Sequence, residues 1–216
     1  MTGLTRMTFM DKSTDYHKKE PVAPDSEQQF INFPMKPHFF FNIMNSIYHS
    51  ITLNPVQAET ILLQLSEMMQ FNIYECSKEK VQLENEIRNI QNYIALNNMR
   101  LSHQPEIHVE VNGDTQGQFI APHILMTFVE NAYQHGLTTQ RDHSFLDINF
   151  FIHKNELQFS AVNSRAVTPP GHRIPAGRGL SKVKKRLESL YPLHHKLSIE
   201  ESPAEYKVRL DMKLAG

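Results

Sequence analysis

Apolar side chains recur every three or four residues along the first half of the chain, and this spacing predicts helices. The first run starts after Pro37 and has the apolar positions Phe39, Ile43, Ile47 and Ile51. Asn54 followed by Pro55 then gives a helix N-cap with proline at the first helical position. We therefore expect two helices, the second over about residues 55–75, that meet at a turn formed by Leu53 and Asn54.

The second predicted helix carries an apolar stripe that is broad enough to pack against two neighbours at once. Its members are Val56, Leu62, Leu63, Leu65, Met68, Met69 and Ile73. An antiparallel hairpin of two such helices can bury this stripe by pairing with a second copy of the chain. A third helix over about 83–101 has one apolar and one polar face, and we expect it to connect the hairpin to the second half of the chain.

After Pro105 the apolar period changes to two, which indicates strands and marks a domain boundary. A first strand ends at the turn Asn112-Gly113-Asp114. The later pattern predicts a helix over 122–137, strands over 145–152 and 156–163, a Pro/Gly loop, a helix over 178–191, and strands over 196–201 and 205–214. These elements give an α+β fold, with a mixed sheet covered by helices on one face.

Three regions follow from these shifts in pattern. Residues 1–30 are polar and interrupted by two prolines, so we expect a flexible tail. Residues 31–104 form a helical domain, and residues 105–216 form the α+β domain.

Composition narrows the function classes. A formal charge of −1, from 22 basic and 23 acidic residues, gives no electrostatic footprint for a nucleic-acid partner or an anionic membrane. The single Cys76 excludes an internal disulfide and is interpreted as a bystander, which fits a reducing cytosol. The chain has no apolar run of membrane-spanning length and does not open like a signal peptide, so we expect a cytoplasmic location.

His38 is the first residue with candidate chemistry. A neutral imidazole is a competent nucleophile near pH 7, so His38 could accept a phosphoryl group. Asn42 lies four residues on, shares its helix face, and could orient the ring. We expect the aromatics at 39–41 to anchor this helix and leave the ring at its edge. The alternative is a structural histidine capped by a backbone carbonyl beside a phenylalanine cluster.

A second polar group lies on the predicted helix over 122–137. Its members are Glu130, Asn131, Gln134 and His135. Phosphoryl transfer needs positioned groups and neutralised charge, usually through a divalent ion that bridges phosphates. Glu130 could polarise the attacking imidazole or help hold the water of the metal ion, and His135 could touch a phosphate oxygen. The alternative is a plain polar helix face that ends at a C-cap formed by Gly136.

Gly177-x-Gly179-Leu180 opens the predicted helix over 178–191. The N–H groups at such a helix start could hold phosphates, although a pair of loop glycines explains the same pattern. The basic residues further along this helix are most simply interpreted as its solvent-exposed face. They are Lys182, Lys184, Lys185 and Arg186.

The segment from Lys36 to Asn42 around His38, followed by Asn45-Ser-Ile47, resembles the phospho-acceptor segment of the LytS-like sensor histidine kinases. The same register continues at Leu83, Glu86, Ile87, Ile90, Tyr93, Ile94, Arg100, Leu101, Pro122, 129–132, His135, Gly136, 177–187 and Tyr191-Pro192. The resemblance covers residues 31–214 in order. It implies a GHKL-type (Bergerat) ATP-binding domain at 105–216 behind a dimerising, phospho-acceptor hairpin at 31–104.

The resemblance also implies a reaction and its partners. A homodimer would autophosphorylate His38 from ATP and pass the group to an aspartate of a response regulator. Asn131 would place its amide oxygen on Mg²⁺, with Glu130 as the proposed base. The remaining nucleotide contacts would come from His135, Asn163, Gly177, Gly179 and Leu180. The signal would come from a separate sensor or membrane protein, or from a part of a longer, membrane-attached parent.

One segment departs from the family pattern. Many kinases of this fold carry Asp-x-Gly-x-Gly, whose carboxylate accepts from the adenine amino group, whereas this chain reads Val162-Asn-Ser-Arg-Ala166. Asn163 can still offer a carbonyl to that amino group and an N–H₂ to a ring nitrogen. Loss of the charge would weaken the contact by about 1 kcal/mol. This departure motivates an alternative, a pseudokinase or docking module that acts through protein contacts. A GHKL ATPase with another output is a third possibility.

Overall fold

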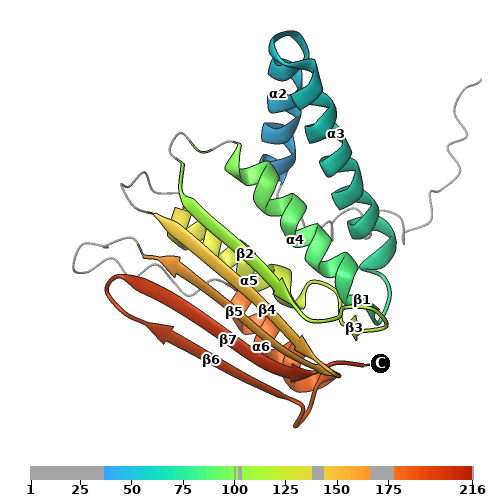
Figure 1. The fold of residues 1–216 in the computed structure, drawn as a ribbon, viewed down its shortest axis with the longest axis vertical. Helices are drawn as coiled ribbons and strands as arrows, with labels where there is room; N and C mark the ends of the chain where they lie inside the picture. The colour runs from blue at the N-terminus through green and yellow to red at the C-terminus, as the bar shows by residue number, and fades with distance from the viewer. Residues whose placement is uncertain (1–36, 100, 102–103, 138–143, 166–177, 216) are drawn as a thin grey trace, which may run out of the picture. The chain divides into compact units, whose positions relative to one another are not determined.

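The computed structural model describes residues 37–99, 101, 104–137, 144–165 and 178–215 (Figure 1). These residues belong to one compact unit, Met35–Gly216. The predicted tail at 1–30 and the Pro/Gly loop lie outside them. The division into domains at residue 104 stays a prediction.

The first two helices form the predicted hairpin, with α2 at Pro37–Leu53 and α3 at Pro55–Gln70. Asn54 is the N-cap, and its Oδ1 accepts the Gln57 N–H at 3.2 Å. The second helix continues as the π-helix η1, Phe71–Glu75, where we expected a regular helix. The predicted N-cap is therefore confirmed, and the prediction of a regular α-helix as far as residue 75 is wrong.

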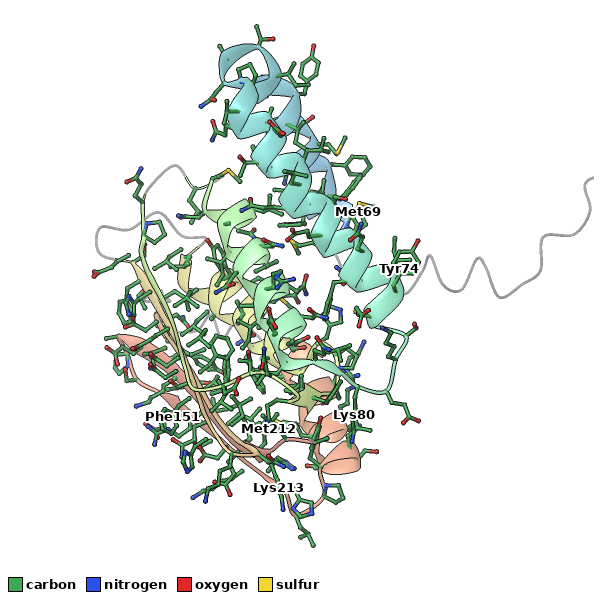
Figure 2. The ribbon with its side chains drawn as sticks, turned by 45° about the vertical axis from the view of Figure 1, so that its right-hand side comes forward. Met69, Tyr74, Lys80, Phe151, Met212 and Lys213 are labelled. Carbon is green, nitrogen blue, oxygen red and sulfur yellow. The ribbon has the colours of Figure 1, made fainter. Side chains whose placement is uncertain are left out.

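Only part of the predicted apolar stripe on α3 is buried within one chain. Leu65 and Met68 are buried, whereas several large apolar side chains of the hairpin stay exposed. These are Phe41, Met44, Tyr48, Ile51, Leu53, Val56, Leu62, Leu63, Ile73 and Tyr74. Tyr74, at the base of the hairpin, points away from the rest of the chain (Figure 2). The hairpin therefore keeps an uncovered apolar surface.

The third helix, α4 at Leu83–Asn98, was predicted to have a polar face, and this is wrong in part. Glu86, Asn89 and Asn92 on α4 are buried together with the apolar positions. The reason is that α4 contacts α3 and also α5, which spans Ile124–Ala132. A helix packed on two sides has little room for a solvated face.

The α+β part contains a five-stranded mixed sheet. Its strands, in spatial order, are β2 (Glu106–Asn112), β4 (Phe145–His153), β5 (Glu156–Ser164), β7 (Glu205–Lys213) and β6 (His195–Glu201). Strands β2 and β4 are parallel and the other neighbours are antiparallel. Alternate residues of β4, β5 and β7 are buried, so one face carries the core. On the opposite face, Phe151 is half-exposed (Figure 2).

The helices α5 and α6, at Arg178–Leu190, lie behind the sheet in Figure 1, on one face. This arrangement confirms the predicted fold class, a helical hairpin followed by a mixed sheet with helices on one side. The turn at Gly113 is also confirmed, because Gly113 has φ +108° and a Cβ there would collide with the Ile152 carbonyl.

Three short elements were not predicted. Strand β1, Val81–Gln82, pairs antiparallel with β3, Phe119–Ile120. Helix α5 is followed by a second π-helix, η2, at Tyr133–Leu137, where we expected a regular helix to continue.

Among the helices within the described residues, none has the length and apolar character needed to cross a bilayer.

Candidate functional site

Asn131 lies near the C-terminal end of α5 and is half-buried. Its side chain hydrogen-bonds Tyr206 of β7. Burial raises the pKa of Tyr206, and the hydrogen bond to Asn131 opposes that shift. Tyr206 therefore stays a neutral phenol that holds the Asn131 side chain against the sheet.

Asn163 is the residue opposite Tyr206 in the β5–β7 ladder. Residues directly opposite each other point to the same face of a sheet, so both side chains face α5. Asn163 is fully buried, and its Nδ2 donates to the Ser164 carbonyl oxygen at 2.8 Å. Its Oδ1 has no hydrogen-bond partner among the described residues. Leaving a buried acceptor without a hydrogen bond costs folding free energy. A ligand or a water that donates to the oxygen would remove that cost.

Gly136 of η2 lies directly against Asn163. A Cβ at position 136 would stand 2.5 Å from Asn163 Nδ2. Ser164 Oγ donates to the Gly136 carbonyl oxygen at 3.4 Å. The C-cap that the alternative interpretation assigned to Gly136 is wrong, because Gly136 lies inside a π-helix. A side chain at position 136 would collide with Asn163, so the position requires glycine.

The π-helix also changes how the polar residues of this segment line up. In η2 the hydrogen bonds run from residue i to i+5, so the spacing that put Glu130 with Gln134 and Asn131 with His135 on one face does not hold. Glu130 is half-buried and Gln134 is exposed, and each has partners in the structure. The side chain of His135 lies outside the described residues.

The start of α6 lies beside α5. A Cβ on Gly179 would meet Thr127 Cγ2 at 3.4 Å, one helical turn before Asn131. Leu180 is buried next to it, while Gly177 lies outside the described residues. The N-terminal N–H groups of α6 are thus close to the helix that carries Asn131.

His38 lies on α2 and is exposed. It does not belong to the group of residues on α5, η2, β5, β7 and α6 described above. Asn42 Nδ2 lies 2.9 Å from His38 Nδ1 and 3.4 Å from Nε2. Phe39 is buried and stacks on Tyr93 of α4, with ring centroids 5.6 Å apart. Phe41 is 65% exposed, so the expected anchoring role is confirmed for Phe39 and wrong for Phe41.

Parts of this chain are similar to known proteins. A family model described as "Histidine kinase" matches residues 26–105. The sensor protein kinase HptS of Staphylococcus aureus (strain USA300) is 34% identical over 135 residues, which are 62% of this chain. Over these stretches the chain is similar to histidine kinases. It spans 24% of the length of the curated relatives it matches.

Two solved structures are similar to this chain at a more distant level. The catalytic domain of histidine kinase ThkA is 15% identical, with a TM-score of 0.46, covering 62% of this chain and 93% of that one. The domain from the Erythrobacter litoralis blue-light activated histidine kinase is 14% identical, with a TM-score of 0.48, covering 88% and 93%. Neither likeness carries an argument about function.

No group of three or more His, Cys, Asp or Glu side chains that could hold a metal ion occurs in the described part of the chain. That finding is compatible with Mg²⁺, which usually binds one or two protein oxygens and substrate phosphates. The side chain of Asn131 carries an oxygen of this chemical type.

Sequence reasoning missed several residues of this site and its surroundings. Tyr206 and Ser164 gave no signal, because their roles depend on strand pairing. Cys76 has a partner that the sequence did not indicate, since its Sγ lies 2.6 Å from His123 Nε2. Arg186 is not solvated like the neighbouring lysines, because it is half-buried and donates to the Pro122 carbonyl oxygen at 2.5 Å.

Proposed function

We propose that this protein is a histidine kinase that transfers the γ-phosphoryl group of ATP to His38 and then to an aspartate of a response regulator. The observation that carries the proposal is the unpaired, buried Oδ1 of Asn163 beside the Asn131–Tyr206 pair. A nucleotide base with an exocyclic amino group supplies the missing donor. The similarity to histidine kinases supports the reaction type.

At the base end of the site, Asn163 Oδ1 accepts a hydrogen bond from the adenine amino group. Asn163 Nδ2 already gives one proton to the Ser164 carbonyl oxygen, which fixes the amide orientation with the oxygen available. Gly136 keeps the backbone of η2 close to this amide. The further donation from Nδ2 to a ring nitrogen stays a prediction.

At the phosphate end, Asn131 offers its amide oxygen to Mg²⁺, and the Asn131–Tyr206 hydrogen bond holds that side chain in place. Mg²⁺ held there would supply positive charge that neutralises the phosphates. Glu130 acts as the base toward the imidazole. The N–H groups at Gly179 and Leu180 face the phosphates. The phosphate contacts predicted for the His135 side chain and for Gly177 involve groups outside the described residues.

His38 is suited to be the acceptor because its ring is exposed on α2 and contacted by Asn42. The oxygen and nitrogen of an amide are assigned from their hydrogen bonds. As placed, Asn42 Nδ2 faces His38 Nδ1. Turning the Asn42 amide over would put Oδ1 on Nδ1, keep the ring proton there and leave the Nε2 lone pair free to attack phosphorus. The bond to phosphorus forms at that nitrogen while ADP leaves.

The partners in this proposal follow from the hairpin. Its uncovered apolar residues, such as Leu62 and Leu63, favour a homodimer in which two hairpins bury them against each other. The phosphorylated histidine would meet the response regulator on this helical surface. The input would come from a separate sensor or from a membrane-attached parent, with the kinase part in the cytoplasm and no nucleic-acid partner. No observation favours the docking-module alternative.

The experiment uses purified chain with Mg²⁺ and γ-labelled ATP. We expect label in the wild type and none in His38→Ala or Asn131→Ala. His49→Ala is the matched control, since His49 is an exposed histidine on the same helix, and it should label normally. The label should be acid-labile and base-stable, as phosphohistidine is. Undiminished label in His38→Ala would overturn the proposal, and nucleotide binding without any label would support the docking module.

A further inference from the structure

Helix α5 has an unusual N-terminus. Its N-cap residue is His123, which has a left-handed backbone (φ 60°, ψ 16°) and makes no side-chain cap. A helix start leaves about four N–H groups without partners, and a local Ser, Thr, Asp or Asn usually caps them. Here the acceptor comes from another helix.

That acceptor is Glu86 of α4. Its Oε2 accepts the N–H of His123 at 3.0 Å, and its Oε1 accepts the N–H groups of Leu125 and Met126 at 3.2 and 3.3 Å. The two carboxylate oxygens thus serve three backbone donors of α5. Glu86 has no solvent exposure, so the whole cap is built inside the protein.

Two further elements hold the same segment. From the hairpin base, the ring of Phe71 packs edge-on to His123 at 5.7 Å, and Cys76 Sγ lies 2.6 Å from His123 Nε2. From α6 and the residue after it, Arg186 donates to the Pro122 carbonyl oxygen, and the Tyr191 hydroxyl accepts the Ala121 N–H at 2.7 Å. The start of α5 is therefore a junction between the hairpin base, α4 and α6.

Building on the proposed function, we propose that Glu86 is a positioning residue for the nucleotide site. By capping α5 from α4, Glu86 fixes the start and the rotation of the helix that presents Glu130 and Asn131 at its other end. Helix α5 has only nine residues, so a shift of its first turn reaches its last turn. The same cap connects movement of the hairpin base to the nucleotide site.

The position is costly for a carboxyl group, which argues against a purely structural role. Burial raises the pKa of Glu86 to about 7, although the three N–H donors and Arg186 lower it. A local cap residue would stabilise the helix without burying an acid. Buried acids with raised pKa values are concentrated at functional sites.

The charge state of the cap should therefore change near neutral pH. The groups that face Glu86 are Cys76, His123, Arg186 and Tyr191. Burial raises the pKa of Cys76 to about 12, lowers that of His123 to about 4 and raises that of Tyr191. Cys76, His123 and Tyr191 thus stay neutral between pH 6 and 8, and Arg186 stays charged. Protonation of Glu86 turns one acceptor oxygen into a donor and weakens the cap.

The test compares wild type with Glu86→Gln in the whole chain, because glutamine keeps the shape and loses the charge. Glu84→Gln is the matched control, an exposed acid on the same helix that pairs with Arg88 at 2.8 Å. The first measurement is amide hydrogen exchange of residues 123–126 without nucleotide. We expect exchange about tenfold faster in Glu86→Gln, the size of a lost charge-assisted bond, and no change in the control.

The second measurement is the affinity for Mg²⁺ and the ATP analogue AMP-PNP between pH 6 and 8. Wild type should bind about tenfold more tightly than Glu86→Gln at pH 8. That ratio should shrink toward one at pH 6, where wild-type Glu86 is protonated. A merely structural role would lower thermal stability and leave the ratio independent of pH. The nucleotide titrates in the same way with both proteins, so its own protonation does not change the ratio of the two affinities.

The possible outcomes are distinguishable. Unchanged exchange at 123–126 in Glu86→Gln, or an affinity ratio that is constant with pH, overturns the proposal. If Glu86→Gln does not fold, the protection of these amides in wild type, relative to that of the most protected amides of the sheet, must fall from pH 8 to pH 6. If wild type binds no nucleotide, the proposed kinase function fails, whereas the exchange result still decides whether Glu86 caps α5.

Discussion

Asn163 and Tyr206 stand directly opposite each other on β5 and β7, and they meet α5 in different ways. Tyr206 hydrogen-bonds Asn131, whereas Asn163 keeps an unpaired Oδ1 in the interior. One cross-strand pair thus holds the residue proposed for the metal ion and offers an acceptor for the base. The two functions depend on the same β5–β7 register, so a slip of one residue would turn both side chains to the other face.

The first prediction concerns that unpaired acceptor. Asn163→Ala removes Oδ1 and should weaken binding of Mg²⁺-ATP about tenfold, the size of one buried hydrogen bond to a ligand. Asn149→Ala is the control, because Asn149 lies on the neighbouring strand β4 and is partly exposed on the other face. Calorimetric titration of both variants measures the effect. Equal affinity in Asn163→Ala and wild type would show that the adenine contact lies elsewhere.

A pair of glycine substitutions tests how tightly η2 packs on β5. Gly136→Ala places a Cβ 2.5 Å from Asn163 Nδ2, so the amide must move, and we expect a loss of about 1–3 kcal/mol of stability with weaker nucleotide binding. Gly179→Ala meets Thr127 at 3.4 Å, an ordinary contact, and replaces glycine inside α6. It should raise stability by up to about 1 kcal/mol.

Chemical denaturation of the two alanine variants measures both changes. The N–H of residue 179 is kept, so nucleotide affinity should also be kept in Gly179→Ala. If Gly136→Ala proved as stable as wild type and bound nucleotide equally well, the close approach of Gly136 to Asn163 would have no functional meaning.

Local patterns were sufficient for most of the fold. The helix start at Asn54-Pro55 and the turn at Gly113 depend on a few neighbouring residues, so their chemistry is visible in the sequence. The strands β4, β5 and β7 were predictable from their alternation, since one face of each is buried.

The π-helices η1 and η2 were not predictable, because one extra residue in a helical turn leaves the apolar spacing almost unchanged. The consequence was largest at the site, where the face shared by Asn131 and His135 was derived from a regular helix. Packing of η2 on Asn163, a long-range contact, favours the wider turn in ways that no local pattern records.

Glu86 left a signal that only the structure explains. It lies between Leu83 and Ile90 on the buried stripe of α4, and a charged residue inside an apolar stripe needs a partner. The partner is the start of α5, about 40 residues further along the chain. Sequence alone gives the anomaly, whereas the identity of the capped helix depends on the tertiary fold.

Cysteine reactivity provides a prediction that does not require nucleotide. Burial raises the pKa of Cys76 to about 12 from 9.0, so very little thiolate exists at pH 8 in the folded protein. We expect alkylation by iodoacetamide to be at least about a hundredfold slower in native protein than in urea, because the thiolate is the nucleophile. Cys76 is the single cysteine of the chain, so intact mass reports it directly. Similar rates in both conditions would contradict the buried contact with His123.

The last prediction concerns how Glu86 and His123 make stability depend on pH in opposite directions. The folded-state pKa of Glu86 is raised from 4.5 to about 7, so the native state holds its proton more tightly and stability falls as pH rises through this window. The folded-state pKa of His123 is lowered from 6.5 to about 4, so stability falls as pH drops through that window. In wild type the two slopes largely cancel between pH 4.5 and 6.5.

Glu86→Gln removes one slope and leaves the other. The free energy of unfolding of the variant, relative to wild type, should therefore rise by about 3 kcal/mol between pH 4.5 and 7, at 1.36 kcal/mol per pKa unit. Urea denaturation of both proteins at several pH values measures this difference, with Glu84→Gln as the control that should show none. A flat difference would mean that Glu86 is ionised in the native state throughout. A rise in the relative stability of Glu86→Gln would mean that ionisation of the buried Glu86 cap on α5 makes wild type less stable at neutral pH.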